Sequence, residues 1–137
     1  YHDSIRARMQ TWPEGVQEGI RCLGFIDRMD LAYRCATFIA SRAGAMSIAE
    51  LALVGKPTIL VPSPVVAEDH QTKNARSLSD RDGAILLPDS EVVDGLEAAI
   101  IGLLEDSDQA KSLQTNLFNA ARPEAAKDVV SELEKLL

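Results

Sequence analysis

Residues 38–50 read Phe38-Ile39-Ala40-Ser41-Arg42-Ala43-Gly44-Ala45-Met46-Ser47-Ile48-Ala49-Glu50, and this stretch decides the fold. An apolar run gives way to small and polar residues around one glycine, and a helix-forming run follows. This order predicts a strand, a tight turn and the start of a helix. Because the first turn of a helix has unpaired N–H groups and the positive end of the dipole, we expect an anion site here. Glu50 lies just inside that helix, where its carboxylate can accept hydrogen bonds from hydroxyls, and a phosphate beside a diol is typical of a nucleotide.

The composition limits the class of protein. The chain has 137 residues, 46% of them hydrophobic, which predicts a single domain over residues 1–137 that ends in helices over 105–137. Its net charge of −7 disfavours binding to nucleic acid or to anionic lipid, since both need clustered Lys and Arg. No segment approaches the roughly 18–20 apolar residues of a membrane helix, so we expect no direct insertion into a membrane.

The start of the chain and its cysteines bear on its origin. Residues 1–4 are polar, carry no signal-peptide pattern and do not begin with Met, so we expect a piece of a longer chain. Cys22 and Cys35 are the only cysteines, and neither belongs to a Cys/His cluster. This usage predicts reduced, buried thiols in a cytosolic protein.

The hydrophobic pattern alternates between strands and helices. We predict strands at 20–26, 37–40, 58–61 and 84–87, and helices at 3–10, 29–36, 45–54, 69–79, 91–104, 108–121 and 124–135. This alternation predicts an α/β fold with a Rossmann-like, doubly wound parallel sheet. The loops at 26–28, 41–47 and 62–71 all follow strands. They should therefore gather at the carboxyl edge of the sheet, where such folds bind ligands.

Ser47 and Glu50 have two interpretations. Ser-x-x-Glu before an apolar run is a capping box, in which both side chains serve the amides of their own helix. In the functional interpretation, Gly44 and Ala45 let a phosphate approach the backbone while Glu50 points sideways to a ribose diol. Arg42 also has two interpretations. It can be an ordinary exposed arginine, or, beside a phosphate-binding turn, its positive charge can help to bind the phosphate.

A second polar segment, Glu68-Asp69-His70-Gln71-Thr72-Lys73-Asn74, opens the helix predicted at 69–79. Asp69 can be a helix N-cap and His70 a surface histidine. Yet His, Gln and Asn supply donors and acceptors suited to sugar hydroxyls, on the same sheet edge as the first site. Asp80-Arg81-Asp82 has the form of a metal motif, but it precedes a strand and reads as a turn. We expect no metal and no cofactor.

On these segments the chain resembles the C-terminal domain of the MurG family, bacterial UDP-N-acetylglucosamine transferases that make lipid II for peptidoglycan. The likeness covers about residues 23–126. It is carried by the turn Ser41-Arg42-Ala43-Gly44-Ala45, by Gly55-Lys56-Pro57, and by Asp69-His70-Gln71-Thr72-Lys73-Asn74-Ala75. The resemblance implies a GT-B glycosyltransferase, with two Rossmann-like domains and the active site between them. It also implies that the C-terminal domain binds the UDP-sugar donor and that the enzyme is an inverting hexosyltransferase.

The resemblance assigns roles at the first segment. It implies that the backbone of Ile26 reads uracil and that Glu50 binds the ribose hydroxyls. The amides of Ala45, Met46 and Ser47 hold the diphosphate. Met46 and Ser47 stand where many relatives have Leu and Thr, and both changes preserve these roles.

It also assigns roles at the second segment and to Arg42. Arg42 lies beside the diphosphate turn in this reading. His70 and Gln71 contact the N-acetylglucosamine hydroxyls, and Asn74 supports their helix.

Parts of the family's pattern do not occur in these 137 residues. The family's domain opens with a strand and a Gly-rich loop that touches the donor, and an N-terminal domain carries the lipid I acceptor site and the general base. We therefore expect a fragment that is inactive alone, from a cytoplasmic protein peripheral to the inner membrane. Two alternatives stay open: a GT-B transferase for another UDP-sugar or acceptor, and a non-catalytic UDP-sugar binding module that acts with a separate acceptor subunit.

Overall fold

The computed structural model describes residues 2–65 and 69–136, and the chain divides into two compact units, Tyr1–Cys35 and Ala36–Leu137. The first unit contains α1 (His2–Met9), α2 (Glu14–Gln17) and α3 (Met29–Cys35). The strand predicted at 20–26 does not form, and its largest side chains are exposed, Leu23 by 61% and Phe25 by 80%. An apolar run becomes a strand only where another strand pairs with its backbone, and the described part of this unit offers none.

The second unit is built on a parallel sheet of β1 (Ile39–Ser41), β2 (Thr58–Leu60) and β3 (Ile85–Leu86), in the order β1-β2-β3. Ile39 pairs with Thr58, and Ile59 pairs with Ile85. All three residues of β2 are completely buried, as the continuous apolar run predicts for the central strand of a parallel sheet. The prediction of an α/β fold with a parallel sheet is confirmed.

Two helices connect these strands, and both keep nearly the predicted bounds. They are α4 (Ala45–Val54) and α5 (His70–Ser79). Gly55 ends α4 in the left-handed conformation, with φ 61°, and its N–H donates to the carbonyl of Leu51 at 2.9 Å. A residue without Cβ takes this conformation at little cost, which is why the helix stops here.

The remaining helices follow β3. They are a short 3-10 turn, η2 (Asp89–Glu91), then α6 (Val92–Glu105), α7 (Ser107–Asn119) and α8 (Ala125–Glu134). Asp106 caps α7, because its side chain accepts hydrogen bonds from the N–H groups of Asp108 and Gln109. Helix α8 buries none of its described residues.

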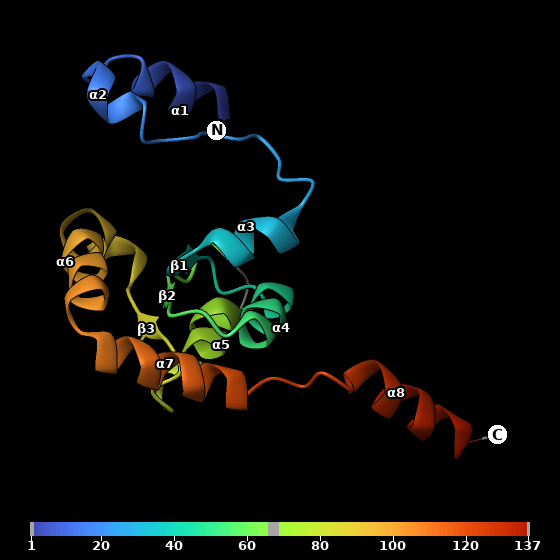
Figure 1. Ribbon diagram of the computed structural model, residues 1–137. Coiled ribbons are helices and arrows are strands. Elements are labelled where there is room, and N and C mark those ends of the chain that lie inside the picture. Colours follow the sequence, from blue (N-terminus) through green and yellow to red (C-terminus); the bar gives the residue numbers. More distant parts are fainter. Residues whose placement is uncertain (1, 66–68, 137) are drawn as a thin grey trace. The chain divides into compact units, whose positions relative to one another are not determined.

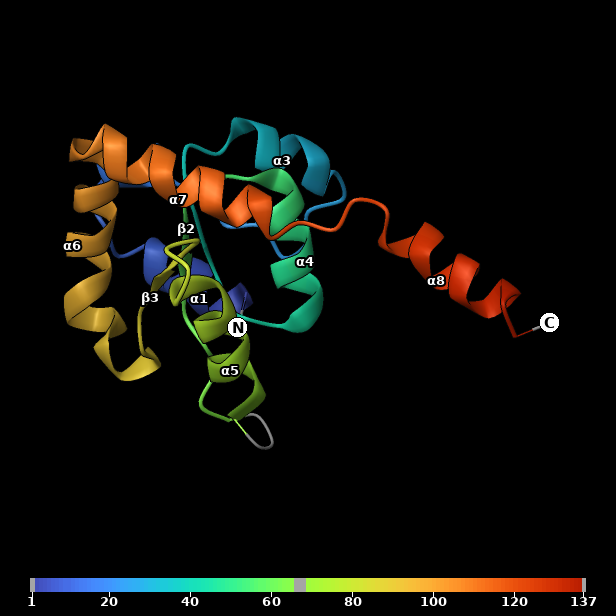
Figure 2. The same cartoon turned by 90° about the horizontal axis from the view of Figure 1, so that it is seen from below.

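Helices cover both faces of the sheet, as Figures 1 and 2 show for α4 and α6 on opposite sides of the strands. On the α6 side, Ile59 and Leu87 pack with Leu103 and Leu113 in the main apolar cluster, and α7 contacts both α6 and α4. On the other side α4 and α5 contact each other, and Leu51 and Ala75 are buried. This layering fixes the strands, so the loops at their carboxyl ends start from a rigid edge.

Two other sequence predictions have outcomes here. Both cysteines are free, but Cys35 is exposed and Cys22 only half-buried, so the prediction of buried thiols was wrong. Cys35 ends α3, a helix with no buried residue, and therefore has no core to enter. Across residues 2–65 and 69–136, no helix has both the length and the apolar character needed to cross a membrane.

Candidate functional site

The turn that joins β1 to α4 ends in an uncapped helix N-terminus. Gly44 is the N-cap residue, in an extended conformation (φ −65°, ψ 148°), and no side chain caps the helix. Its carbonyl accepts the first helical hydrogen bond, from the N–H of Ile48 at 2.9 Å. The N–H groups of Ala45, Met46 and Ser47 precede that bond, so the helix itself gives them no partner. Ala45 and Met46 are exposed, Met46 by 76%, and an uncapped helix start of this kind is suited to an anion.

The capping-box interpretation of Ser47 and Glu50 is wrong. A capping box needs Ser47 at the N-cap, but α4 begins at Ala45, which places Ser47 in the first turn and Glu50 in the second. The hydroxyl of Ser47 lies 3.5 Å from the point that a Cβ on Gly44 would occupy. Ser47 therefore holds its hydroxyl over the start of the helix, next to the uncapped amides. Glu50 is exposed on the following turn.

Arg42 joins the ends of all three strands. Its Nη1 donates to the carbonyls of Val61 (3.4 Å) and Pro62 (3.3 Å), just after β2, and to the carboxylate of Asp89, just after β3. The side chain of Arg42 is 54% exposed and that of Asp89 35%. A shallow pocket of about 260 Å³ opens at this edge of the sheet, lined by Ala40, Ser41, Arg42, Val61, Asp89 and Val92.

Sequence reasoning missed Asp89. It lies 47 residues from Arg42 in the chain, and no local pattern links the two. One signal was present: Asp89 follows a predicted strand, and residues that follow parallel strands meet at the same edge of the sheet. Applying that rule to the loop after residue 87, as well as to the earlier loops, would have found it.

Helix α5 brings the second polar segment to the first. Nδ2 of Asn74 donates to the carbonyl of Ala43 at 3.1 Å, which ties α5 to the turn before α4. The backbone N–H of Ser63 donates to Oε1 of Gln71 at 2.9 Å, which ties α5 to the loop after β2. His70 is the first residue of α5 and is exposed. Hydrogen bonds therefore join two segments whose contact residues, Ala43 and Asn74, are 31 residues apart in the chain. Glu68 lies outside the described residues.

Asp69 occupies the N-cap position of α5, as predicted, but does not act as a cap. Its backbone is left-handed, with φ 55°, and its side chain makes no capping hydrogen bond. Aspartate is among the few non-glycine residues that take this conformation readily, so Asp69 suits the turn into α5.

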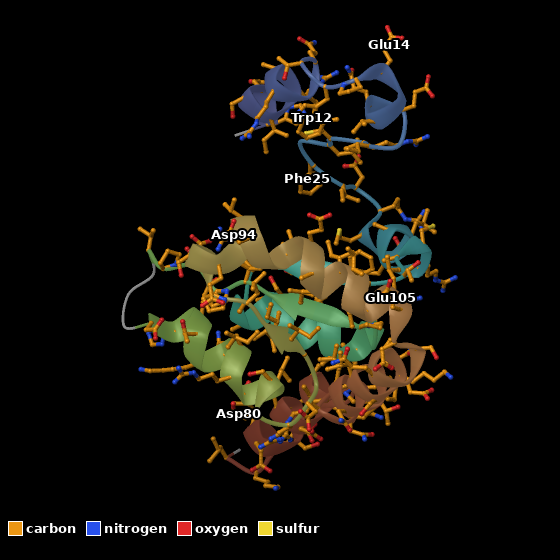
Figure 3. The ribbon with its side chains drawn as sticks, turned by 90° about the vertical axis from the view of Figure 1, so that its left-hand side faces the viewer. Trp12, Glu14, Phe25, Asp80, Asp94 and Glu105 are labelled. Carbon is orange, nitrogen blue, oxygen red and sulfur yellow. The ribbon has the colours of Figure 1, made fainter. Side chains whose placement is uncertain are left out.

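Ile26 belongs to the first unit and is 38% exposed, beside the more exposed Phe25 that Figure 3 labels. Nearby, Nε and Nη2 of Arg28 donate to the two carboxylate oxygens of Asp30 at 2.9 and 2.7 Å. This pair lowers the pKa of the Asp30 carboxyl below its ordinary value, because the hydrogen bonds favour its ionised form.

The described residues contain no group of three or more His, Cys, Asp or Glu side chains arranged to hold a metal ion. The turn Asp80-Arg81-Asp82 lies at the C-terminal end of α5, where Figure 3 labels Asp80. A ten-residue helix is about 15 Å long, so this turn is far from the segment that begins at His70. Asp82 has φ 51°, and the predicted turn there is confirmed.

Comparison with known proteins identifies the family. Residues 4–129 match the glycosyltransferase family 28 C-terminal domain. The chain belongs to this family. Within it, a Flavobacterium psychrophilum protein is 46% identical over 91% of this chain, and one from Porphyromonas gingivalis strain W83 is 45% identical over the whole chain. Both carry the name UDP-N-acetylglucosamine--N-acetylmuramyl-(pentapeptide) pyrophosphoryl-undecaprenol N-acetylglucosamine transferase.

A solved structure supports the same placement within glycosyltransferase family 28. The crystal structure of Acinetobacter baumannii MurG matches 85% of this chain with a TM-score of 0.76 and 31% identity. The resemblance to MurG and the Rossmann-like fold of a GT-B C-terminal domain are both confirmed. This chain spans about a third of the length of these relatives: 34% and 35% of the two sequences and 33% of the crystallised chain.

Proposed function

We propose that this chain is the donor-binding part of an inverting hexosyltransferase that moves N-acetylglucosamine from UDP-N-acetylglucosamine to lipid I, forming lipid II. One observation carries the proposal: the hydrogen bond from Asn74 to the carbonyl of Ala43 joins the polar segment of α5 to the turn that leads into the uncapped start of α4. An anion-binding helix end beside sugar-suited side chains fits a nucleoside diphosphate sugar.

The diphosphate binds at the start of α4 in this proposal. The N–H groups of Ala45, Met46 and Ser47 donate to its oxygens, the Ser47 hydroxyl adds a further donor, and Gly44 keeps the approach open. Glu50 faces the ribose hydroxyls from the next turn, because a carboxylate that faced the diphosphate would be repelled.

The two ends of the donor bind elsewhere. The resemblance to the family assigns recognition of the uracil base to the backbone of Ile26. His70 and Gln71, at the start of α5, contact the hydroxyls of N-acetylglucosamine. Oε1 of Gln71 accepts from the Ser63 N–H, which fixes the amide, and Nε2, which carries both N–H donors, donates to the sugar.

The same amides also explain how the donor reacts. When the acceptor C4 hydroxyl attacks the anomeric carbon from the face opposite UDP, negative charge grows on the leaving diphosphate. Fixed N–H dipoles stabilise that charge without reorganisation, and removing one such donor in an enzyme typically costs about 3–4 kcal/mol. The general base and the lipid I site belong to the N-terminal domain of the full-length enzyme, which acts at the cytoplasmic face of the inner membrane.

Calorimetric titration of the purified chain with UDP, UDP-N-acetylglucosamine and UDP-glucose tests the proposal. We expect UDP to bind, UDP-N-acetylglucosamine to bind more tightly than UDP-glucose, and the chain alone to transfer no sugar. A preference for UDP-glucose would favour a transferase with another donor, and no binding of any uridine nucleotide would refute the proposal. Transfer to lipid I by the full-length natural protein then separates a transferase from a non-catalytic binding module.

A further inference from the structure

We propose that Asp89 is a positioning residue for the diphosphate: it anchors one end of the Arg42 guanidinium and so leaves the other edge to bind phosphate oxygens. This inference rests on the proposed function and concerns how the same site takes its anion. Neither the nucleotide-binding turn nor the helix α4 contains Asp89, which enters the site from the loop after β3.

The first argument is the distribution of hydrogen bonds on Arg42. A guanidinium has five N–H donors, in a planar fork that matches a carboxylate or a phosphate. In Arg42, all three protein acceptors, the carbonyls of Val61 and Pro62 and the carboxylate of Asp89, are on Nη1. Within residues 2–65 and 69–136, the structure gives Nε and Nη2 no partner.

The second argument is a contrast within the same chain. Arg28 also pairs with an aspartate, but its Nε and Nη2 donate to both oxygens of Asp30, and this contact closes the fork. Arg42 meets Asp89 end-on, through Nη1 alone. In Arg28 the Nε and Nη2 edge is therefore occupied by Asp30. In Arg42 the contact with Asp89 anchors the side chain through Nη1 and leaves the Nε and Nη2 edge available.

The third argument is location and exposure. Arg42 and Asp89 both line the pocket of about 260 Å³ at the carboxyl edge of the sheet. The side chain of Arg42 is 54% exposed, so a ligand can reach it. An exposed ion pair contributes little to stability. The main effect of Asp89 is therefore to position the charged guanidinium of Arg42.

The occupant of that edge is the diphosphate. Arg42 is two residues before Gly44, where the uncapped amides of α4 begin. Planar, bidentate recognition by arginine suits phosphate oxygens, and the added positive charge offsets the repulsion from an acidic chain with a net charge of −7. A guanidinium anchored in advance loses less side-chain freedom when the anion binds.

The test compares the affinities of the 137-residue chain for UDP and for uridine, which lacks the phosphates. We expect Asp89→Ala to lower the affinity for UDP about fivefold and to leave the affinity for uridine unchanged. Asp89→Asn should lose less, because its amide oxygen still accepts from Nη1. Arg42→Lys should resemble Asp89→Ala, since one ammonium cannot both pair with Asp89 and form a fork, and the double variant should lose little more than either single variant.

Glu124→Gln is the matched control, because it removes the exposed carboxylate that pairs with Lys127 at 2.7 Å in another part of the chain. It should leave both affinities unchanged. Equal losses of UDP and uridine in Asp89→Ala would show a merely structural role, and tighter UDP binding would show that Asp89 competes with the phosphate; either result overturns the inference while the proposed function stands. If the unaltered chain binds no UDP, both fail.

Discussion

Asn74 gives the sharpest test of the site, because its side chain is the contact that joins α5 to the turn before α4. Asn74→Ala removes the 3.1 Å hydrogen bond to the carbonyl of Ala43, a residue with no exposed surface. A buried carbonyl left without its donor costs about 1–3 kcal/mol. Since Asn74 itself is only half-buried, and water can replace part of the bond, we expect a loss of about 1–2 kcal/mol in the free energy of unfolding.

Asn74→Asp refines that prediction at constant side-chain size. An ionised carboxylate cannot donate and would face the Ala43 carbonyl, so this variant should be less stable at pH 7 than Asn74→Ala. The ionised form is disfavoured in the folded state, which raises the pKa of the introduced carboxyl there. Its protonated form can donate, so the stability of this variant should improve relative to Asn74→Ala as the pH falls through the raised pKa of the folded state toward the ordinary value of about 3.9.

Urea denaturation, followed by circular dichroism, measures these losses, and calorimetry measures the affinity for UDP. Asn116→Ala is the control: Nδ2 of Asn116 donates to the carbonyl of Asp82 at 3.2 Å, a bond of the same kind in another place. We expect Asn116→Ala to lower stability without changing the affinity for UDP, whereas Asn74→Ala should weaken UDP binding as well. If Asn74→Ala binds UDP as tightly as the unaltered chain, the tie between α5 and the turn does not shape the site.

Three further predictions concern single residues. Glu50→Ala should lower the affinity for UDP severalfold and lower the affinity for 2′,3′-dideoxy-UDP, which lacks the ribose hydroxyls, by less. Equal losses of affinity for both nucleotides would exclude the ribose contact. Gln71→Glu keeps the acceptor for the Ser63 N–H but removes the Nε2 donor, so the ratio of UDP-N-acetylglucosamine affinity to UDP affinity should fall while thermal stability holds; an unchanged ratio would contradict the sugar contact. Gly55→Ala should lower the free energy of unfolding by about 1 kcal/mol or more, because φ is 61° and the new Cβ would lie 3.3 Å from the Phe118 ring; unchanged urea denaturation would show that the helix end relaxes freely.

The sequence predicts most of the sheet-and-helix framework because its local signals agree. Gly55 followed by Pro57 stops α4 where predicted, and the apolar run around Ile59 is fully buried in the centre of the sheet. The segment from Ile20 to Ile26 has a similar apolar character but forms no strand. Hydrophobicity along the chain does not say whether a partner strand lies alongside, and pairing is a property of the tertiary fold.

The candidate site was partly predictable from the order of the elements along the chain. The order of strands and loops brings α4 and α5 to one edge, and Asn74 does lie against Ala43. The Ser-x-x-Glu pattern misled because Ser47 and Gly44 are both good N-cap residues, and the pattern alone does not say which one begins the helix. Asp89 was beyond local reasoning, since its pairing with Arg42 depends on how three loops converge.

The turn at residues 42–44 is held from two directions before any ligand binds. On one side Arg42 contacts the ends of β2 and β3, and on the other Asn74 holds the carbonyl of Ala43. The described residues contain no cis peptide bond, so a carbonyl of Ala43 fixed toward α5 directs the N–H of Gly44 away from α5. The orientation of that donor is thus set by a contact outside the turn. Under the proposed function, a turn whose N–H groups are oriented in advance stabilises a developing charge without the cost of reorganisation, so Asn74, which is not proposed to touch the nucleotide, affects how well the turn binds it.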